Sequence, residues 1–416
     1  MSNFKPFKAV RPLPAYAERV AALPYDVMTS DEAREMVIDN PHSFLHVDKA
    51  EIDLPLGTDL YSEEVYAKAA ENLKDLETYE IMKQDRFDCY YIYEQTWQGR
   101  TQTGVVGCAS IDEYINGKIK KHELTRADKE ADRIHHVDTC NANTGPIFLT
   151  YKGSDEINKL IDIYEKTNMP VYDFTSTGDV HNRVWVVNND QGVCDKFRAA
   201  FESVDAFYIA DGHHRCASAV KVGQKRREEN PGYTGDEEFN FFLAIAFPKE
   251  QLRILDYNRV IKDLNGLSKE DFLKAVNEKF VIETTTGLEP FAPDARHSFG
   301  MFLCGKWYKL TAKDGTFDDS DPVARLDVSI LQENMISPIF GIDDPRTDKR
   351  IDFIGGIRGL GELERRVNTD MKIAFSMYPT TLEDLMDIAD AGKIMPPKST
   401  WFEPKLLSGL FIHKLS

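Results

Sequence analysis

The chain lacks long apolar runs, paired cysteines and an excess of positive charge. No run approaches the 18 apolar residues that a membrane-spanning helix requires, and the N-terminal segment MSNFKPFKAV lacks the apolar core of a signal peptide. The six cysteines include no C-x-x-C pair, so neither a zinc knuckle nor a disulfide framework is indicated. With 51 Lys and Arg against 69 Asp and Glu, the formal net charge of −18 repels polyanions. We therefore expect a cytoplasmic protein without membrane or DNA partners.

The composition is that of a globular protein with a substantial core. Of 416 residues, 42% are hydrophobic, which is enough to fill two or three domains. Segments typical of strands alternate with amphipathic helical segments, and this alternation predicts a multidomain α/β and α+β fold with mixed sheets. We place the boundaries so that an N-terminal α+β domain covers 1–192, a central module covers 193–265 and a C-terminal α+β domain covers 266–416.

The N-terminal part contains two clear helix patterns and a predicted hairpin. A helix over 29–37 has Thr29 or Ser30 as its N-cap, and a helix over 62–76 carries one apolar stripe. Two runs of aromatic and β-branched residues, 88–95 and 104–111, are separated by a polar turn. These two runs predict antiparallel strands.

The stretch 206–223 organises the rest of the prediction. Its first five residues form an apolar run that predicts a buried strand, and Asp211-Gly212 then predicts a tight turn. The residues after the turn predict a helix with small side chains on its packing face. Gly223 stands where a left-handed helix stop is expected.

The residues at the start of this predicted helix are suited to binding an anion. His213, His214 and Arg215 fall in its first turn, where backbone N–H groups lack intrahelical partners and the helix dipole is positive. A guanidinium beside such an N-terminus can hold phosphate oxygens in a bidentate fork. A turn with surface histidines is the simpler alternative.

A second candidate stretch runs from Lys120 to Asp138. The residues from Thr125 to Asp128 match a capping box, so we predict a helix from about Arg126 and place His122 and Glu123 in the preceding loop. His122-Glu123-Leu124-Thr125-Arg126 has no second histidine, and it is therefore not the two-histidine zinc helix of metalloproteases.

Glu123 is a candidate general base because its carboxylate stands at a helix entrance beside a histidine. Lys129 and Arg133 lie four residues apart on one helix face, where they face either solvent or a ligand. Asp132 with His135 or His136 could ligate a metal, but residues three and four positions apart also form ordinary surface pairs.

The C-terminal part contains one apparent phosphate motif. Residues 392–399 have the spacing of a P-loop, but Pro397 replaces its second glycine and removes an N–H group that a phosphate cradle needs. We reject a P-loop here. Lys398 is retained as a candidate that covers a site from an extended segment.

One compact basic cluster lies near the central module. Lys221, Lys225, Arg226 and Arg227 could contact a few phosphates, but cations are also favoured at a helix C-terminus by its dipole. We predict no specific binding of duplex DNA.

Two resemblances add to these observations. Tyr208–Val220, with its Asp-Gly-His-His-Arg core, resembles the signature of the ParB/sulfiredoxin superfamily, in which a strand, a turn and a helix bind nucleotide phosphates. Six further strings resemble the bacterial and archaeal family called domain of unknown function (DUF) 1015. They are Pro24-Tyr25-Asp26-Val27, Asn40-Pro41-His42-Ser43-Phe44-Leu45, His122-Glu123-Leu124-Thr125, Leu255-Asp256-Tyr257-Asn258-Arg259, Gly341-Ile342-Asp343-Asp344-Pro345-Arg346 and Met395-Pro396-Pro397-Lys398-Ser399-Thr400.

The superfamily resemblance implies a ParB/sulfiredoxin-like nucleotide-binding module over 193–265. It favours nucleotide-dependent phosphoryl transfer to a small hydroxylated metabolite, with free serine as the first acceptor and ATP or ADP with Mg²⁺ as the cofactors. The alternative is a non-catalytic nucleotide-binding regulatory or partner-binding protein, which needs the same phosphate site but no base.

The kinase hypothesis assigns a role to each candidate residue. Glu123 takes the hydroxyl proton, Asp211 positions Mg²⁺ or the acceptor, and His213 helps to hold the transferring phosphate. The nucleotide-binding set is Gly212, His213, His214, Arg215, Lys129, Arg133 and Lys398. The expected partners are thus a nucleotide and a small-molecule acceptor. A homodimer is a possible assembly.

Overall fold

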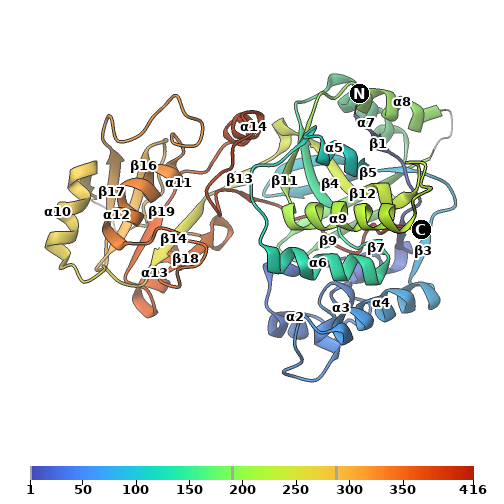
Figure 1. Cartoon of the computed structure of the whole chain (residues 1–416), viewed down its shortest axis with the longest axis horizontal. Coiled ribbons are helices and arrows are strands. Elements are labelled where there is room, and N and C mark those ends of the chain that lie inside the picture. The colour runs from blue at the N-terminus through green and yellow to red at the C-terminus, as the bar shows by residue number, and fades with distance from the viewer. Residues whose placement is uncertain (1, 189–191, 286–288) are drawn as a thin grey trace. The chain divides into compact units, whose positions relative to one another are not determined.

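The computed structural model describes residues 2–188, 192–285 and 289–416. Contacts divide the chain into two compact units (Figure 1). The first unit contains the residues up to Leu252 together with Pro404–Ser416, and the second unit contains Arg253–Glu403. None of the helices in the described ranges has both the length and the apolar character that crossing a bilayer requires.

A mixed sheet of nine strands forms the centre of the first unit. Its order is β6-β11-β8-β12-β5-β4-β10-β9, and β1 pairs with β5. The strands are β1 (Phe4–Lys5), β4 (Tyr90–Trp97), β5 (Arg100–Ser110), β6 (Ile119–Lys120), β8 (Ile147–Tyr151), β9 (Tyr172–Ser176), β10 (Val180–Val187), β11 (Phe207–Asp211) and β12 (Phe241–Pro248). The pairs β6–β11 and β8–β12 are parallel, and the other neighbours are antiparallel.

Helices α6 and α9 lie side by side beside this sheet (Figure 1). The helices of the first unit are α1 (Ala17–Val20), α2 (Ser30–Met36), α3 (Leu45–Asp48), α4 (Glu63–Thr78), α5 (Ile111–Ile115), α6 (Ala127–Cys140), α7 (Asp155–Thr167), α8 (Val193–Glu202) and α9 (His213–Glu229). Cys216, Ala219 and Val220 of α9 enter a core that also contains Phe207 and Leu149 of the sheet. This packing fixes the start of α9 against the ends of β11 and β8.

Short strand pairs complete the first unit. β2 (Val10–Pro12) pairs with β3 (Met82–Gln84), and β7 (Ala142–Asn143) pairs with β21 (His413–Lys414). The last pair attaches the C-terminal segment to the first unit.

The second unit is built on an antiparallel sheet of order β15-β17-β16-β19-β14-β18. Its strands are β14 (Tyr257–Ile261), β15 (Phe280–Thr284), β16 (Ser298–Leu303), β17 (Lys306–Ala312), β18 (Ile351–Gly355) and β19 (Ile373–Ser376), and a separate pair joins β13 (Ile254–Leu255) to β20 (Trp401–Phe402). Its helices are α10 (Lys269–Lys279), α11 (Asp327–Leu331), α12 (Ser337–Phe340), α13 (Gly361–Thr369) and α14 (Leu382–Asp390).

The predicted mixed α/β character with several sheets is confirmed, but the compact units differ from the three predicted ranges. β11 and β12 of the predicted central module are hydrogen-bonded to β6, β8 and β5 of the predicted N-terminal domain. Through β11 and β12, the range 193–265 shares one sheet with the residues before it, whereas its last strand, β14, belongs to the sheet of the second unit.

Most of the local elements predicted for the first unit are confirmed. α2 has a capping box at Thr29, α4 begins after Ser62, and β4 and β5 form the predicted hairpin. The prediction for Gly223 is wrong. α9 continues through it to Glu229, and a Cβ at this position would lie 2.7 Å from Cδ1 of Ile111, so Gly223 permits close packing within the helix.

Candidate functional site

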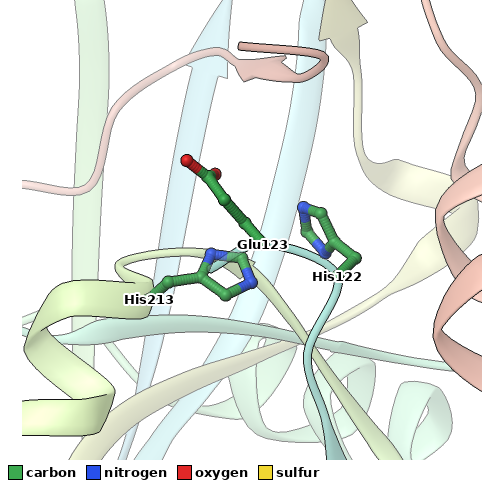
Figure 2. A group of neighbouring side chains, drawn as sticks. All are labelled: His122, Glu123 and His213. Atoms are coloured by element: carbon green, nitrogen blue, oxygen red, sulfur yellow. The ribbon is translucent and has the colours of Figure 1, made fainter. Parts of the chain in front are cut away.

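The parallel pairing of β6 with β11 brings two distant segments together. Lys120 lies opposite Tyr208, and the two strands run in the same direction, so the segments that follow them leave the sheet at the same end. His122 and Glu123 follow β6 directly, while His213 begins α9 just beyond β11. Figure 2 shows the three side chains coming from these two neighbouring segments. Both stretches singled out in the sequence therefore contribute to one location.

Gly212 makes the turn from β11 into α9. Its φ of 89° lies in the left-handed region, which glycine adopts without the strain that a Cβ causes. The backbone N–H of Gly212 donates to Oδ1 of Asp211 over 2.8 Å. The N-cap of α9 is Gly212, which has no side chain to cap the helix, and the positive end of the helix faces the turn.

His122 and His213 are both buried and lie edge to face. They are 1% and 6% exposed, and their ring centroids are 4.5 Å apart at an interplanar angle of 87°. Both nitrogens of His122 and Nε2 of His213 have no hydrogen-bond partner among the described residues. Burial lowers the pKa of His122 well below its ordinary value and lowers that of His213 to about 4. Both rings are therefore neutral near pH 7, and each has one nitrogen with a lone pair.

Glu123 completes a group of three potential ligands. One carboxylate oxygen of Glu123, one nitrogen of His122 and one nitrogen of His213 all lie within 4.8 Å of one another. Glu123 is half-buried, whereas both imidazoles are buried. The predicted placement of Glu123 beside a helix entrance and a histidine agrees with this geometry, and its role as a base stays a prediction.

Asp211 and His214 have partners that the sequence did not indicate. Nζ of Lys405 donates to Oδ2 of Asp211 over 2.8 Å. Burial acts to raise the pKa of Asp211, but Lys405 and the N–H of Gly212 keep it below its ordinary value. Nε2 of His214 accepts a hydrogen bond from the backbone N–H of Arg126 over 3.0 Å, which links the starts of α9 and α6.

Arg215 forms a buried ion pair with Asp48. Its Nη2 lies 3.0 Å from Oδ2 of Asp48, and the same carboxylate accepts hydrogen bonds from Ser408 at 2.7 Å and Thr144 at 3.0 Å. Burial acts to raise the pKa of Asp48, but Arg215 and other nearby cations hold it below its ordinary value. A charged carboxylate is thus built into the interior beside α9.

Arg133 and Arg215 both contact the aromatic ring of Tyr25. The guanidinium carbons of Arg133 and Arg215 lie 4.1 Å and 5.0 Å from the ring centroid of Tyr25. Nε of Arg133 donates to Asp132 over 3.0 Å, and its buried Nη1 has no hydrogen-bond partner within the ranges that the structure describes. The structure therefore brings Arg133 and Arg215 together.

The two lysines of the predicted nucleotide-binding set, Lys129 and Lys398, each contact a different tyrosine. Nζ of Lys129 donates to the hydroxyl of Tyr61 over 3.1 Å, whereas the neighbouring Arg133 is buried. Lys398 belongs to the second unit, where its Nζ lies 5.7 Å from the ring centroid of Tyr257. Contact of either lysine with a nucleotide stays a prediction.

The capping box predicted at the start of α6 is wrong. Arg126 is the N-cap and makes no side-chain capping bond, and the hydroxyl of Thr125 donates to Glu130 over 2.7 Å. Sequence reasoning also missed Asp48 and Lys405 as site partners. Nothing in their local sequence signals these roles, because both contacts join segments that are far apart in the chain.

All four members of the basic cluster are paired with acidic side chains. Lys221 pairs with Glu130, Lys225 and Arg226 pair with Asp138, and Arg227 pairs with Asp112. Their positive charge is therefore largely compensated within the first unit.

A comparison with protein families identifies the chain. The model of the family described as "Protein of unknown function (DUF1015)" matches residues 4–329. The chain belongs to the DUF1015 family. This match includes the loop after β6 and the start of α9, so His122, Glu123 and His213 lie within the matched residues, whereas Lys405 and Ser408 lie beyond them.

Solved structures similar to this DUF1015 protein have low sequence identity. A mutant of free serine kinase in complex with AMP matches with 12% identity and a TM-score of 0.37, covering 72% of this chain and 86% of that one. A conserved hypothetical protein from Pyrococcus furiosus matches with 14% identity and a TM-score of 0.36, covering 74% and 94%. SbnI with a C-terminal truncation, from Staphylococcus aureus, matches with 11% identity and a TM-score of 0.37, covering 73% and 85%. No curated protein matches the chain.

Proposed function

We propose that this DUF1015 protein is a nucleotide-dependent phosphotransferase that acts on a small hydroxylated metabolite. The supporting observation is that the buried guanidinium of Arg133 and the partly buried guanidinium of Arg215 contact the same Tyr25 ring, with Arg215 in the first turn of α9. Helix N-termini bind phosphate through free backbone N–H groups, and arginine holds phosphate oxygens in a bidentate fork. We choose ATP or ADP as the nucleotide because the Asp-Gly-His-His-Arg segment resembles the ParB/sulfiredoxin signature. Free serine is the first candidate acceptor.

Arg215 keeps donors for a phosphate despite its ion pair. A guanidinium has five N–H donors, and the bonds to Asp48 and Ser408 both come from Nη2. Asp48 then acts as a fixed counter-charge that holds the guanidinium in place. Gly212, His213 and His214 contribute the turn and the first helical residues against which the phosphates would lie.

Mg²⁺ would accompany the nucleotide and is assigned to Asp211. In the structure, the ammonium group of Lys405 lies on this carboxylate at 2.8 Å. Binding of Mg²⁺ to Oδ2 would therefore displace Lys405, which could then contact a phosphate oxygen.

The proposed reaction uses Glu123 as general base. The hydroxyl oxygen of the acceptor forms a bond to the terminal phosphorus of the nucleotide as the bond from that phosphorus to its bridging oxygen breaks. The hydroxyl proton passes to the Glu123 carboxylate, and the nucleotide leaves with one phosphate fewer. Arg133 and Arg215 would stabilise the charge on the transferring group.

Nucleotide binding can be tested by thermal shift. At 100 times Kd, ATP or ADP with Mg²⁺ should stabilise the protein by about 2.7 kcal/mol, which corresponds to roughly 5–10 °C for a unit of this size. Arg215→Lys keeps the charge that pairs with Asp48 but loses the planar fork, so its shift should be much smaller. Arg226→Lys, in the same helix but paired with Asp138, is the matched control and should behave like the wild type. A wild type that no nucleotide stabilises would contradict the proposal.

Turnover separates the enzyme from the alternative. Phosphorus NMR of the protein with nucleotide, Mg²⁺ and serine or other hydroxylated metabolites should show a new phosphomonoester. Glu123→Gln should keep the nucleotide-dependent thermal shift and lose about two to four orders of magnitude in rate. Nucleotide binding without turnover of any acceptor would instead favour a non-catalytic regulatory or partner-binding protein.

A further inference from the structure

The buried imidazoles of His122 and His213 lack the partners that buried polar groups normally have. Both nitrogens of His122 and Nε2 of His213 are shielded from solvent, and no described residue hydrogen-bonds to them. Leaving such groups unpaired is costly, so native proteins usually supply a side chain, a water or an ion. A carboxylate oxygen of Glu123 lies within 4.8 Å of a nitrogen on each ring.

We propose that His122, Glu123 and His213 bind a divalent first-row transition metal, with Zn²⁺ as the leading ion. Two imidazoles and one carboxylate are a common ligand set for zinc sites that keep an open position, and for other first-row metals. Mg²⁺ prefers oxygen ligands and fits this set poorly. The inference does not rest on the proposed phosphotransferase function, and it gives Glu123 and His213 a different role from the one proposed there.

Small adjustments would complete the geometry. Tetrahedral Zn²⁺ with bonds of about 2.0–2.1 Å places its ligand atoms roughly 3.3 Å apart, and the three candidate atoms already lie within 4.8 Å. The two rings are in edge-to-face contact, and Glu123 has a longer, half-buried side chain whose rotation can close the remaining distance. Figure 2 shows that Glu123 and His122 leave the backbone at successive positions and that His213 comes from the neighbouring segment.

The fourth position of such a metal would lie near the start of α9. The helix dipole and the metal would both attract an oxygen anion there, such as a phosphate or carboxylate oxygen. Glu123 cannot serve as a metal ligand and as a free base at the same time. With the metal bound, a coordinated water or hydroxyl would instead lose its proton more easily.

Metal binding can be measured without nucleotide or acceptor. The full-length protein is stripped with a chelator and desalted, then titrated with Co²⁺ while its visible absorption is followed, and with Zn²⁺ in a calorimeter. We expect one ion per chain, a Co²⁺ spectrum typical of nitrogen and oxygen ligands, and no displacement by excess Mg²⁺. Absence of Co²⁺ and Zn²⁺ binding, or displacement by Mg²⁺, would overturn the inference.

Variants test the ligand set. His213→Gln and Glu123→Gln should each weaken Co²⁺ binding by about 100-fold or more, since even outer-shell changes cost 10–100-fold. His181→Gln removes a histidine that pairs with Asp173 elsewhere in the unit and should leave binding unchanged. Circular dichroism of the metal-free proteins checks folding, and Glu123→Gln is the decisive variant if the buried His213 tolerates no change. Unchanged Co²⁺ affinity in folded Glu123→Gln would refute the assignment, while the nucleotide thermal shift would still report on the proposed function.

Discussion

Replacing Asp48 by asparagine should destabilise the first unit strongly, because it removes one partner of a buried ion pair. The carboxylate is 3% exposed and accepts hydrogen bonds from Arg215, Ser408 and Thr144. Asparagine keeps the shape but leaves the partly buried guanidinium of Arg215 without a counter-charge. Removing one member of a buried pair typically costs about 3–5 kcal/mol, which corresponds to a fall in Tm of roughly 6–20 °C for a unit of this size.

Thermal and urea unfolding can measure this effect with an internal reference. The chain contains two compact units, so the data are fitted with two transitions, and only that of the first unit should move. Glu71→Gln breaks a surface pair with Lys68 in α4 and should cost less than about 1 kcal/mol. Comparing the two variants shows how much more the loss of the buried Asp48 charge lowers the free energy of unfolding than the loss of the exposed Glu71 charge in the same unit.

A double-mutant cycle tests the reasoning more sharply. Arg215→Met removes the guanidinium, and combining it with Asp48→Asn removes both charges together. The double variant should be less destabilised than the sum of the singles by about 2 kcal/mol or more, because neither charge is then left unpaired. Additive costs, or a cost of Asp48→Asn no larger than that of Glu71→Gln, would refute the view that Arg215 depends on Asp48.

Three further predictions concern other parts of the chain. Burial raises the pKa of Asp327 to about 7, so this carboxyl keeps its proton in the folded second unit at pH values where the unfolded chain has released it. The free energy of unfolding of the second unit should therefore fall by up to about 4 kcal/mol as pH rises from 4 to 7. Asp327→Asn should flatten this slope in urea titrations, and an equal slope would contradict the assignment. Gly145→Ala should displace Arg215, because the added Cβ would lie 2.6 Å from the Cζ of Arg215. We expect the free energy of unfolding to fall by about 1–3 kcal/mol and the nucleotide-dependent thermal shift to become smaller, and an unchanged Tm would argue against the contact. Specific duplex DNA binding at physiological salt should be absent because the basic cluster of α9 is already paired with acids, and sub-micromolar affinity for a preferred sequence in an anisotropy titration would overturn this expectation.

Local signals predicted the part of the site that follows β11. An apolar run, an Asp-Gly turn and a helix start lie next to one another in the sequence, and each depends mainly on neighbouring residues. Gly212 shows this well, since its left-handed conformation follows from the turn itself. Gly223 shows the limit of such reasoning. Its role depends on contact with Ile111, a residue far away in the chain, so a local rule for helix ends was misleading there.

The partners across the site were not predictable in the same way. β6 has only two residues, too short for a recognisable periodic pattern, yet its parallel pairing with β11 places His122 against His213. Asp48 follows a string noted only for its family resemblance, and no local feature indicates that it faces Arg215. The residue types of the site could therefore be inferred from the sequence, whereas its pairings depend on the order of strands in the sheet.

The return of Pro404–Ser416 to the first unit makes the second unit an insertion within it. Since a ribosome synthesises the chain from its N-terminus, Lys405 and Ser408 emerge only after the whole of Arg253–Glu403 has been made. Until then, Asp211 lacks its ammonium partner and Asp48 lacks the hydroxyl that helps to hold it. Domains generally fold as units during synthesis, so the second unit can be complete while the site is still unfinished. The nascent chain thus acquires its full set of site contacts late, after the inserted unit has had time to fold.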